Sequence, residues 1–283
     1  MKVIHYESAE AFLDNNLAFL ETQEAANNLI LGLAFGMKKG KYSLKGSLLF
    51  SITEENQILF SALQTPGRYL TIYGEERAVP MAISWLSQFC HETEDTIPGI
   101  LGPDKLALSF VQAWPSQAVI PWKLQRKQRV FQLDQVADIP YAAGKLRRAV
   151  SSDQQAIAAW LIDFHLEAIQ EDISGSELEK AQQMIHSNRL YVWEDQEIVS
   201  MAASTRATQH GITINAVFTP TRFRKKGYAS SCVASLSQQL LDQGYQFCSL
   251  FTDAANPTSN KIYQKIGYYE VAKFQSIILF PSD

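Results

Sequence analysis

Four cations crowd against one glycine in the stretch TPTRFRKKGYASSCV, residues 219–233. The cations are Arg222, Arg224, Lys225 and Lys226, and the glycine is Gly227. A strand-like apolar run at 212–218 precedes them, and small residues suited to the first turn of a helix come after them. The first N–H groups of a helix have no internal acceptor, and the helix dipole places partial positive charge there. This junction therefore predicts a phosphate site, and Gly227 lets the backbone approach the ligand because it has no Cβ.

The loop alone does not identify the phosphate. Neither GxxxxGK[ST] nor GxGxxG is present, which excludes the two common nucleotide-loop patterns. The residues read Arg-x-x-Gly-x-Ala at 224, 227 and 229. A solvated basic turn without a ligand explains this short pattern equally well.

A second segment, LFTDAANPTSNKIYQKIGYYEV from Leu250, carries a polar helix face. Asn256 suits a helix cap with Pro257 at the first position, and Gly267 suits the end. Asn256 and Asn260 are four residues apart and Tyr263 comes three later, so their side chains share one face. A face of two amides and a phenol is too polar for a core, which indicates that it faces a ligand.

The two segments together resemble the GNAT superfamily of acyl-coenzyme A-dependent N-acetyltransferases. The resemblance covers about residues 145–283 and places the motifs in the family's order and strand–helix context. It rests on Val217-Phe218-Thr219, on 224–229, and on Asn256…Tyr263…Gly267-Tyr268. The second segment is also similar to a bacterial branch of predicted acetyltransferases whose N-terminal half is a divergent GNAT-like unit. This implies an α+β fold: a C-terminal GNAT domain with a mixed, mostly antiparallel sheet and helices on both faces, after a degenerate GNAT-like α/β domain.

The resemblance implies acetyl-CoA as co-substrate, and no metal. The backbone of Val217 and Thr219 would pair with pantetheine, and the N–H groups of the 224–229 loop with Ser230 would hold the pyrophosphate. Arg222 and one of the lysines would reach other phosphates, Asn256 would contact the pantetheine arm, and Asn260 would assist. The implied coenzyme-binding residues are Val217, Phe218, Thr219, Arg224, Lys225, Lys226, Gly227, Tyr228, Ala229, Ser230, Asn256 and Asn260.

The implied catalytic residues are Tyr263 and Glu167. Tyr263 matches the family position where a phenol lies near the thioester sulfur, and a tyrosine with a pKa near 10 can protonate the departing thiolate. A tyrosine buried for packing is the alternative. For the general base the candidates are Glu167 and Asp253, of which we choose Glu167, and water can also remove the proton. Glu194 and Glu197 suit a solvated hairpin turn.

The predicted reaction is transfer of an acetyl group to a primary amine of a small molecule, by direct attack of the amine on the thioester. Alternatives are a protein or peptide N-acetyltransferase, and an acyl-CoA-binding module without activity that acts as a sensor or scaffold. The amine acceptor and the acyl chain preference are left open by these motifs.

Turn residues divide the pattern of predicted elements in two. We expect an N-terminal domain at 1–134, a linker at 135–144 around Pro140 and Gly144, and the GNAT domain at 145–283. The N-terminal domain lacks the arginine–glycine loop. Its nearest analogue, Pro98–Asp104, has an acid where a phosphate would lie, so we expect it to bind no coenzyme and either to wall the acceptor pocket or to support the fold.

Composition sets the remaining expectations. The 283-residue chain has a formal net charge of -4 and a pI of about 5.8, which disfavours a nucleic-acid partner. Its three cysteines show no pairing pattern and its histidines no metal spacing. The N-terminus is not of signal-peptide type, and the apolar run at 29–37 is too short for a membrane span. We expect a cytoplasmic protein without a membrane partner, either a monomer or a homodimer.

Overall fold

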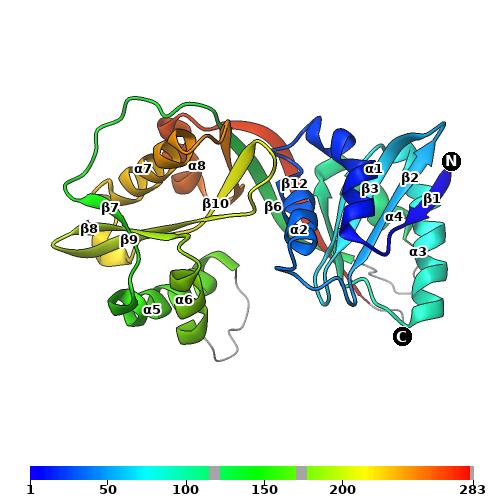
Figure 1. Cartoon of the computed structure of the whole chain (residues 1–283), viewed down its shortest axis with the longest axis horizontal. Coiled ribbons are helices and arrows are strands. Elements are labelled where there is room, and N and C mark those ends of the chain that lie inside the picture. The colour runs from blue at the N-terminus through cyan, green and yellow to red at the C-terminus, as the bar shows by residue number, and fades with distance from the viewer. Residues whose placement is uncertain (115–121, 170–176, 281–283) are drawn as a thin grey trace. The chain divides into compact units, whose positions relative to one another are not determined.

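The computed structural model describes residues 1–114, 122–169 and 177–280. The chain divides into two compact units, each of which has its own sheet and helices (Figure 1). Unit 1 comprises residues 1–130 and 270–283, and unit 2 comprises residues 131–269.

Unit 1 has seven strands in the order β1-β2-β3-β4-β5-β12-β6. From β1 to β12 the neighbours are antiparallel except for the parallel pair β4 and β5. Its elements are β1 (Lys2–His5), α1 (Ala9–Glu21), α2 (Asn28–Lys38), β2 (Leu48–Glu54), β3 (Gln57–Gln64), β4 (Leu70–Gly74), α3 (Val79–Thr93), β5 (Gly99–Pro103), α4 (Asp104–Ala113), most of β6 (Trp122–Leu133) and most of β12 (Tyr269–Leu279). The turn between β2 and β3 holds Glu55 and Asn56 at φ 50° and 65°. Two adjacent residues with positive φ match the twist of a tight hairpin.

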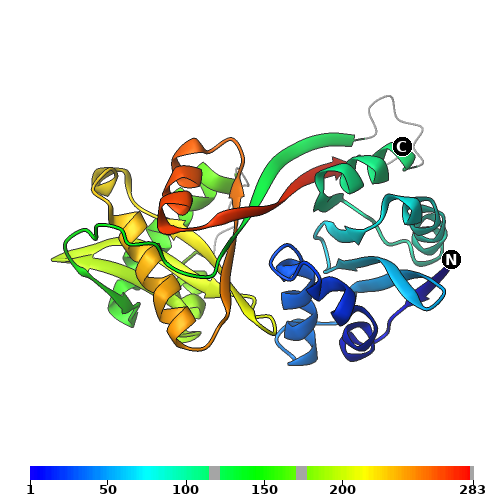
Figure 2. The same ribbon diagram turned by 90° about the horizontal axis from the view of Figure 1, so that it is seen from above.

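The sheet of unit 1 has a core on each face, because alternate residues of a strand point to opposite sides. Leu48, Phe50 and Ile52 of β2 pack with α3 and α4, whereas Leu49 packs with α1 and α2. Figure 2 shows the blue helices α1 and α2 on one face and the cyan to teal helices α3 and α4 on the other.

Unit 2 has the strand order β11-β10-β9-β8-β7, with the end of β6 beside β11. β10 and β11 are parallel, and the other pairs from β10 to β7 are antiparallel. Its elements are β7 (Lys145–Arg148), α5 (Gln154–Phe164), a π-helical turn (His165–Ile169), α6 (Glu177–His186), β8 (Leu190–Asp195), β9 (Glu197–Thr205), β10 (Gly211–Phe218), α7 (Tyr228–Asp242), β11 (Phe247–Asp253) and α8 (Pro257–Ile266).

Unit 2 also has helices on both faces of its sheet. One core contains Val233 and Leu236 of α7 and Ile266 of α8, and the other contains Ile157 and Leu161 of α5 with Ile185 of α6. Figure 1 shows α7 and α8 on one side of β8–β10 and α5 and α6 on the other. The expected fold class, an α+β chain with a mixed, mostly antiparallel sheet and helices on both faces, is confirmed in this unit.

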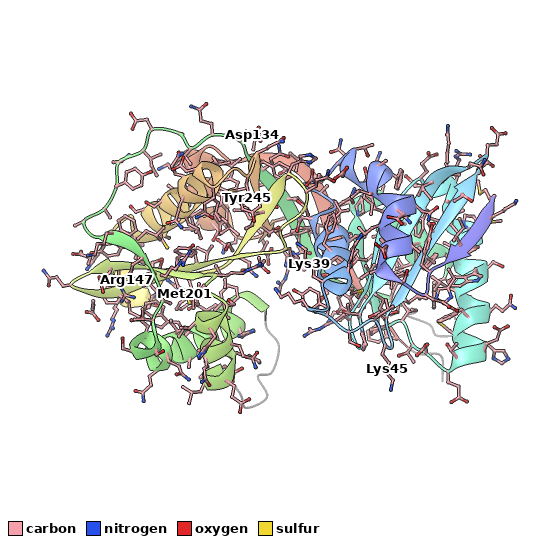
Figure 3. The ribbon with its side chains drawn as sticks, viewed as in Figure 1. Lys39, Lys45, Asp134, Arg147, Met201 and Tyr245 are labelled. Carbon is pink, nitrogen blue, oxygen red and sulfur yellow. The ribbon has the colours of Figure 1, made fainter. Side chains whose placement is uncertain are left out.

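One side-chain network fixes the edge of this sheet. Arg147 of β7 donates to both carboxylate oxygens of Asp153, at 2.7 and 3.0 Å, and to Glu194 Oε1 at 2.9 Å (Arg147 is labelled in Figure 3). Asp153 directly precedes α5 and Glu194 belongs to β8. The guanidinium therefore joins the edge strand to the start of α5, and Glu194 is an ion-pair partner rather than a freely solvated charge.

The division into units differs from the expected domain ends. Residues 270–283 group with unit 1, because residues 274–278 of β12 pair with β5. The expected linker 135–144 groups with unit 2 and is bonded to it at three points. Ala137 N donates to Ile266 O, Ala142 N to Ser231 Oγ, and Trp193 Nε1 to Ala143 O, each at 2.8 Å. Figure 3 labels Asp134, where this segment begins.

Candidate functional site

The two parallel strands of unit 2 separate before they end. The register of β10 with β11 runs from Gly211 opposite Phe247 to Thr213 opposite Ser249. β10 continues to Phe218 and β11 to Asp253, so the ends of both strands lie outside this register. Backbone groups without a strand partner need another one. The gap between the diverging strand ends therefore offers donors and acceptors to an extended ligand.

A β-bulge in β10 accompanies this separation. On the other side of β10, Asn215 pairs with Ala203 and Phe218 pairs with Met201, so β10 has one extra residue over this interval. Ala216 lies within the bulge and has φ 49°. A non-glycine residue at positive φ is uncommon, and a bulge bends its strand. The bulge thus bends β10 at Ala216 and Val217, which no residue of β9 opposes in the register.

The loop after β10 ends at a glycine whose conformation matters more than its size. Gly227 has φ 85° and is the N-cap of α7, so it contributes no side chain to the first N–H groups of that helix. A Cβ at this position would lie 3.6 Å from Ala142 Cβ, an ordinary contact. Lys225, two residues earlier, also has positive φ, 63°. Left-handed residues in one short loop expose backbone N–H groups to an anion.

The four cations of this loop fall into two kinds. Arg222 Nη2 lies 3.2 Å from Glu197 Oε2, and Arg224 Nη2 lies 2.7 and 2.9 Å from the two oxygens of Glu167. Lys225 and Lys226 are exposed, and neither has an ion pair with any residue that the structure describes. Two lysines without carboxylate partners beside a helix N-terminus favour binding of an anion.

On α8, the two asparagines have different environments. Asn256 Oδ1 accepts from Ser259 N at 3.0 Å and so caps the helix, as the sequence predicts. Asn260 is 7% exposed, and its Nδ2 donates to the carbonyls of Asp253 and Ala254 at 3.2 and 3.4 Å. Its Oδ1 is buried and has no partner within the described part of the chain. A buried acceptor without a donor costs about 1–3 kcal/mol, so this oxygen is suited to an N–H group of a ligand.

Tyr263 lies one turn further along α8 and is 8% exposed. Its ring packs against Phe131 and Tyr268, with centroid separations of 6.5 and 6.0 Å. No described residue forms a hydrogen bond with its hydroxyl group. Burial raises the pKa of the Tyr263 phenol to about 12, so the phenol keeps its proton at neutral pH. It is therefore a proton donor rather than a base under those conditions.

The candidate carboxylates have partners of their own. Both oxygens of Glu167, which lies on the π-helical turn after α5, accept from Arg224. Asp253 Oδ1 accepts from Ala255 N at 2.7 Å, within its own turn. The structure thus brings Glu167 to the phosphate-type loop, an arrangement that the sequence does not indicate because 57 residues separate it from Arg224.

Two further side chains, Ser200 and Asp195, support the site although the sequence did not predict them. Ser200 Oγ donates to the Phe218 carbonyl at 3.1 Å and lies 2.8 Å from Thr219 Oγ1. Asp195 Oδ2 accepts from the Tyr228 hydroxyl at 2.6 Å, which fixes the first residue of α7 to the hairpin between β8 and β9. Ser200 is a single serine within a strand, and nothing in the sequence distinguishes it. Asp195, in a short polar turn, gave only a weak signal.

Comparisons with known proteins agree with this geometry. The family model described as GNAT acetyltransferase matches residues 190–277, most of which lie in unit 2. No curated protein matches the chain. No helix among the described residues is long and apolar enough to cross a membrane.

Solved structures match both units. An acetyltransferase of the GNAT family from Colwellia psychrerythraea matches at 12% identity with a TM-score of 0.59, covering 99% of this chain and 100% of that one. A GCN5-related N-acetyltransferase from Sphaerobacter thermophilus matches at 15% identity and 0.59, covering 99% and 97%. A tandem GNAT protein from the clavulanic acid biosynthesis pathway matches at 11% identity and 0.57, covering 100% and 99%.

At these identities the likeness shows the fold, and the full coverage extends it to both units, as expected for two GNAT-like domains in tandem. The family match assigns the segment that contains α7, α8 and the loop between β10 and α7 to the GNAT acetyltransferase model. The resemblance inferred from the two sequence motifs is confirmed. Residues 190–277 thus belong to a GNAT acetyltransferase domain, and the chain has the fold of solved GNAT acetyltransferases.

Proposed function

We propose that the protein transfers an acetyl group from acetyl-CoA to a primary amine of a small molecule. The GNAT fold implies the acetyl-CoA co-substrate, and the amine is the part of this statement that goes beyond it. The observation that carries the proposal is the open end of the β10–β11 pair, which leads directly into a loop with two lysines that have no carboxylate partner among the described residues. The chain has a net negative charge, which suits any cationic amine, whether it belongs to a small molecule or to a peptide. A peptide amine is therefore the second candidate acceptor.

Each part of the coenzyme has suitable residues in unit 2. The backbone of Val217, in the bulge of β10, and the N–H group of Thr219, directly after the strand, would pair with the pantetheine arm, whereas the Thr219 carbonyl already accepts from Arg224 Nε. The buried Oδ1 of Asn260 fits a pantetheine amide N–H, and Asn256 adds its amide group at the start of the same helix. The N–H groups from Lys225 to Ala229, with the Ser230 hydroxyl, would hold the pyrophosphate, whereas the Arg224 N–H group already donates to the Thr221 carbonyl at 3.2 Å. Lys225 and Lys226 supply the opposite charge.

Besides positioning the two substrates, the protein mainly has to allow the amine to lose a proton and the departing sulfur to gain one. Acetyl-CoA supplies an activated thioester, whose carbonyl a neutral amine attacks directly. Backbone N–H groups at the bulge of β10 would stabilise the negative charge that develops on the carbonyl oxygen. Tyr263, protonated at neutral pH and without a hydrogen-bond partner among the described residues, would donate its proton to the departing sulfur. Since both oxygens of Glu167 are engaged by Arg224, we assign removal of the amine proton to water.

The test separates binding from turnover. Isothermal titration with acetyl-CoA is expected to show binding that Lys225→Glu with Lys226→Glu weakens at least about tenfold, because two attractive charges become repulsive. Lys45→Glu with Lys105→Glu makes the same change of charge at two exposed lysines of unit 1 and serves as the matched control. Unchanged affinity in the double lysine variant would contradict the assigned phosphate site.

Turnover is measured as thiol release from acetyl-CoA across polyamines, aminoglycosides, amino acids and peptides. Tyr263→Phe is expected to lower kcat at least about tenfold with little change in acetyl-CoA affinity. Equal loss of both would make Tyr263 a binding or packing residue. Binding of acetyl-CoA without turnover of any amine would instead indicate a sensor or scaffold module.

A further inference from the structure

The side chain of Arg224 lies on the face of the sheet opposite the one to which the phosphate loop leads. Its guanidinium carbon lies 5.7 Å from the centroid of the Phe218 ring. Phe218 belongs to the core beneath α5 and α6, where it contacts the rings of Trp160 and Phe164 at 6.4 and 6.5 Å. The loop itself continues into α7 on the other face of the sheet. The backbone of Arg224 thus belongs to the phosphate loop, while its side chain belongs to the α5 side.

The donors of Arg224 are largely taken by the protein. Nε donates to the Thr219 carbonyl at 2.9 Å, which ties the loop back to the end of β10. Nη2 donates to both oxygens of Glu167. A guanidinium has five N–H donors in a fixed fork, so only the Nη1 pair is without a partner among the residues that the structure describes. Arg224 is therefore held by hydrogen bonds and an ion pair within the protein, whereas Lys225 and Lys226 have no ion pair with a described residue.

We infer that Arg224 and Glu167 form a positioning pair that fixes the segment after α5 to the coenzyme loop. Arg224 then serves the acceptor side of the site rather than phosphate binding. The inference rests on the proposed function for the identity of the loop and for the acceptor side. It assigns Glu167 the role of a fixed partner rather than of a base.

The Arg224–Glu167 pair positions Glu167 and adds little to the stability of the fold. The side chains of Arg224 and Glu167 are 40% and 49% exposed, and ion pairs this exposed contribute little to stability. What the pair does provide is a defined place for Glu167, on a π-helical turn of the kind that often occurs at functional sites. It also neutralises a carboxylate that would otherwise repel the coenzyme phosphates.

A linkage results from the same contacts. When coenzyme A orders the backbone of the loop, it also fixes the base of the Arg224 side chain. The segment ending in Glu167 should then become better protected against exchange, although it makes no phosphate contact. A pair that served only to stabilise the fold would not respond to coenzyme in this way.

The experiment uses the full-length protein, with coenzyme A as the probe. Hydrogen–deuterium exchange is followed for residues 157–167 with and without coenzyme A, and affinity is measured by titration calorimetry. The variants are Arg224→Gln, Glu167→Gln and the swap Arg224→Glu with Glu167→Arg. Arg222→Gln is the matched control, since it also removes an exposed arginine–glutamate pair from this loop, and Lys225→Gln with Lys226→Gln reports on phosphate binding.

Arg224→Gln and Glu167→Gln are each expected to raise the exchange rate of 157–167 at least about threefold and to remove its response to coenzyme A. Affinity for coenzyme A should change by less than about threefold, against about tenfold or more for the double lysine variant. The charge swap should restore part of the protection, whereas Arg222→Gln should leave 157–167 unchanged.

Two results would overturn the inference. One is a loss of coenzyme affinity in Arg224→Gln as large as that in the double lysine variant, which would make Arg224 a phosphate ligand. The other is unchanged exchange at 157–167 in both single variants. If the wild-type protein bound no coenzyme A, the proposed function would fail, while exchange without coenzyme would still decide whether the pair holds this segment.

Discussion

Both units contain a strand that leads into a helix and then into a parallel neighbouring strand, and among the described residues we assign an anion site to one of these crossings. In unit 1 the crossing is β4–α3–β5, and in unit 2 it is β10–α7–β11. The parallel registers are similarly short, ending at Thr71 opposite Leu101 and at Thr213 opposite Ser249. The strand connection is therefore shared, and the difference lies in the backbone beyond the paired residues.

In unit 1 the strands stay in contact beyond the register. A Cβ on Gly102 of β5 would lie 2.9 Å from the Ile72 carbonyl oxygen, so the two backbones leave no room for a ligand. The turn into α3 contains two carboxylates, Glu75 and Glu76, and its one cation, Arg77, forms ion pairs with Glu75 and Glu54. Unit 2 has a bulge, a left-handed glycine and two lysines without described carboxylate partners at the corresponding places. The fold thus supplies the crossing in both units, and we propose that a few local residues decide whether it binds coenzyme.

The largest expected difference between the units is in their stability at high pH. Burial raises the pKa of Cys232, Cys248 and Tyr263 to about 12, and that of Tyr268 well above its ordinary value. Cys90, the cysteine of unit 1, is only partly buried, and burial raises its pKa as well, so unit 1 has this one thiol where unit 2 has the four groups just named. A raised pKa in the folded state gives stability that is complete below the unfolded pKa and is lost as pH rises toward the folded one. Unit 2 should therefore lose stability between about pH 9 and pH 12.

The size of this effect depends on the protons that the unfolded chain releases. A tyrosine has a pKa of about 10 in the unfolded chain, so at pH 11 each tyrosine that stays protonated in the folded protein lowers the free energy of unfolding by about 1.4 kcal/mol. Each buried cysteine lowers it by more, because the pKa of an unfolded cysteine is lower still. Exchange measured peptide by peptide from pH 8 to pH 11 should show unit 2 opening first. Tyr263→Phe removes one of these groups without removing a hydrogen bond to any described residue and should raise the midpoint. Simultaneous loss of both units at one pH, unaffected by this variant, would contradict the comparison.

The next effect in size is stabilisation by coenzyme. A ligand at one hundred times its Kd stabilises the state that binds it by about 2.7 kcal/mol. Acetyl-CoA should therefore protect β10, residues 219–227 and α7 against hydrogen exchange, and leave residues 70–79 of unit 1 unchanged. Protection of 70–79 that equals that of the 219–227 loop would indicate a second coenzyme site and would remove the distinction between the two crossings.

Much of this asymmetry was predictable from sequence, where local rules decide the structure. Asn256, Pro257 and Gly267 mark the ends of α8 as expected, because capping depends on residues within one turn. Gly227 begins α7 for the same reason. The polar residues Glu54-Glu55-Asn56 between two apolar runs are likewise a local signal, and they form the turn from β2 to β3.

Long-range pairings were the part that sequence could not supply. The last strand, β12, pairs with β5 of unit 1, although more than 160 residues separate 274–278 from 99–103. The Arg224–Glu167 ion pair and the bulge at Ala216 depend likewise on tertiary placement. An alanine carries no signal for a bulge, and a glutamate on a helix face does not name its partner.

Two glycines, Gly227 before α7 and Gly74 at the end of β4, differ in the space around them. Both have positive φ, 85° at Gly227 and 152° at Gly74. Gly227 has ordinary space around a hypothetical Cβ, whereas a Cβ on Gly74 would also clash with the Leu59 carbonyl oxygen. Gly227→Ala should therefore distort the loop at a cost of about 1–2 kcal/mol, weakening acetyl-CoA binding about fivefold to thirtyfold. Gly74→Ala should lower the melting temperature and leave affinity unchanged. The reverse pattern, with binding lost only in Gly74→Ala, would place the coenzyme in unit 1.

The smallest effect concerns two buried asparagines, one in each unit. Asn260 and Asn27 are 7% and 2% exposed, and each has a buried Oδ1 with no partner among the described residues. Each also donates through Nδ2 to a backbone carbonyl, Asn27 to Leu20 at 2.8 Å and Asn260 to Asp253 at 3.2 Å. The two alanine variants should thus lose comparable stability, about 1 kcal/mol. Only Asn260→Ala should also weaken acetyl-CoA binding, about threefold to tenfold, because its Oδ1 is the acceptor that we assign to the pantetheine arm. Calorimetry decides between this and an equal, purely structural role: if both variants bound acetyl-CoA as tightly as the wild type, the unpaired oxygen of Asn260 would be a feature of packing, like that of Asn27.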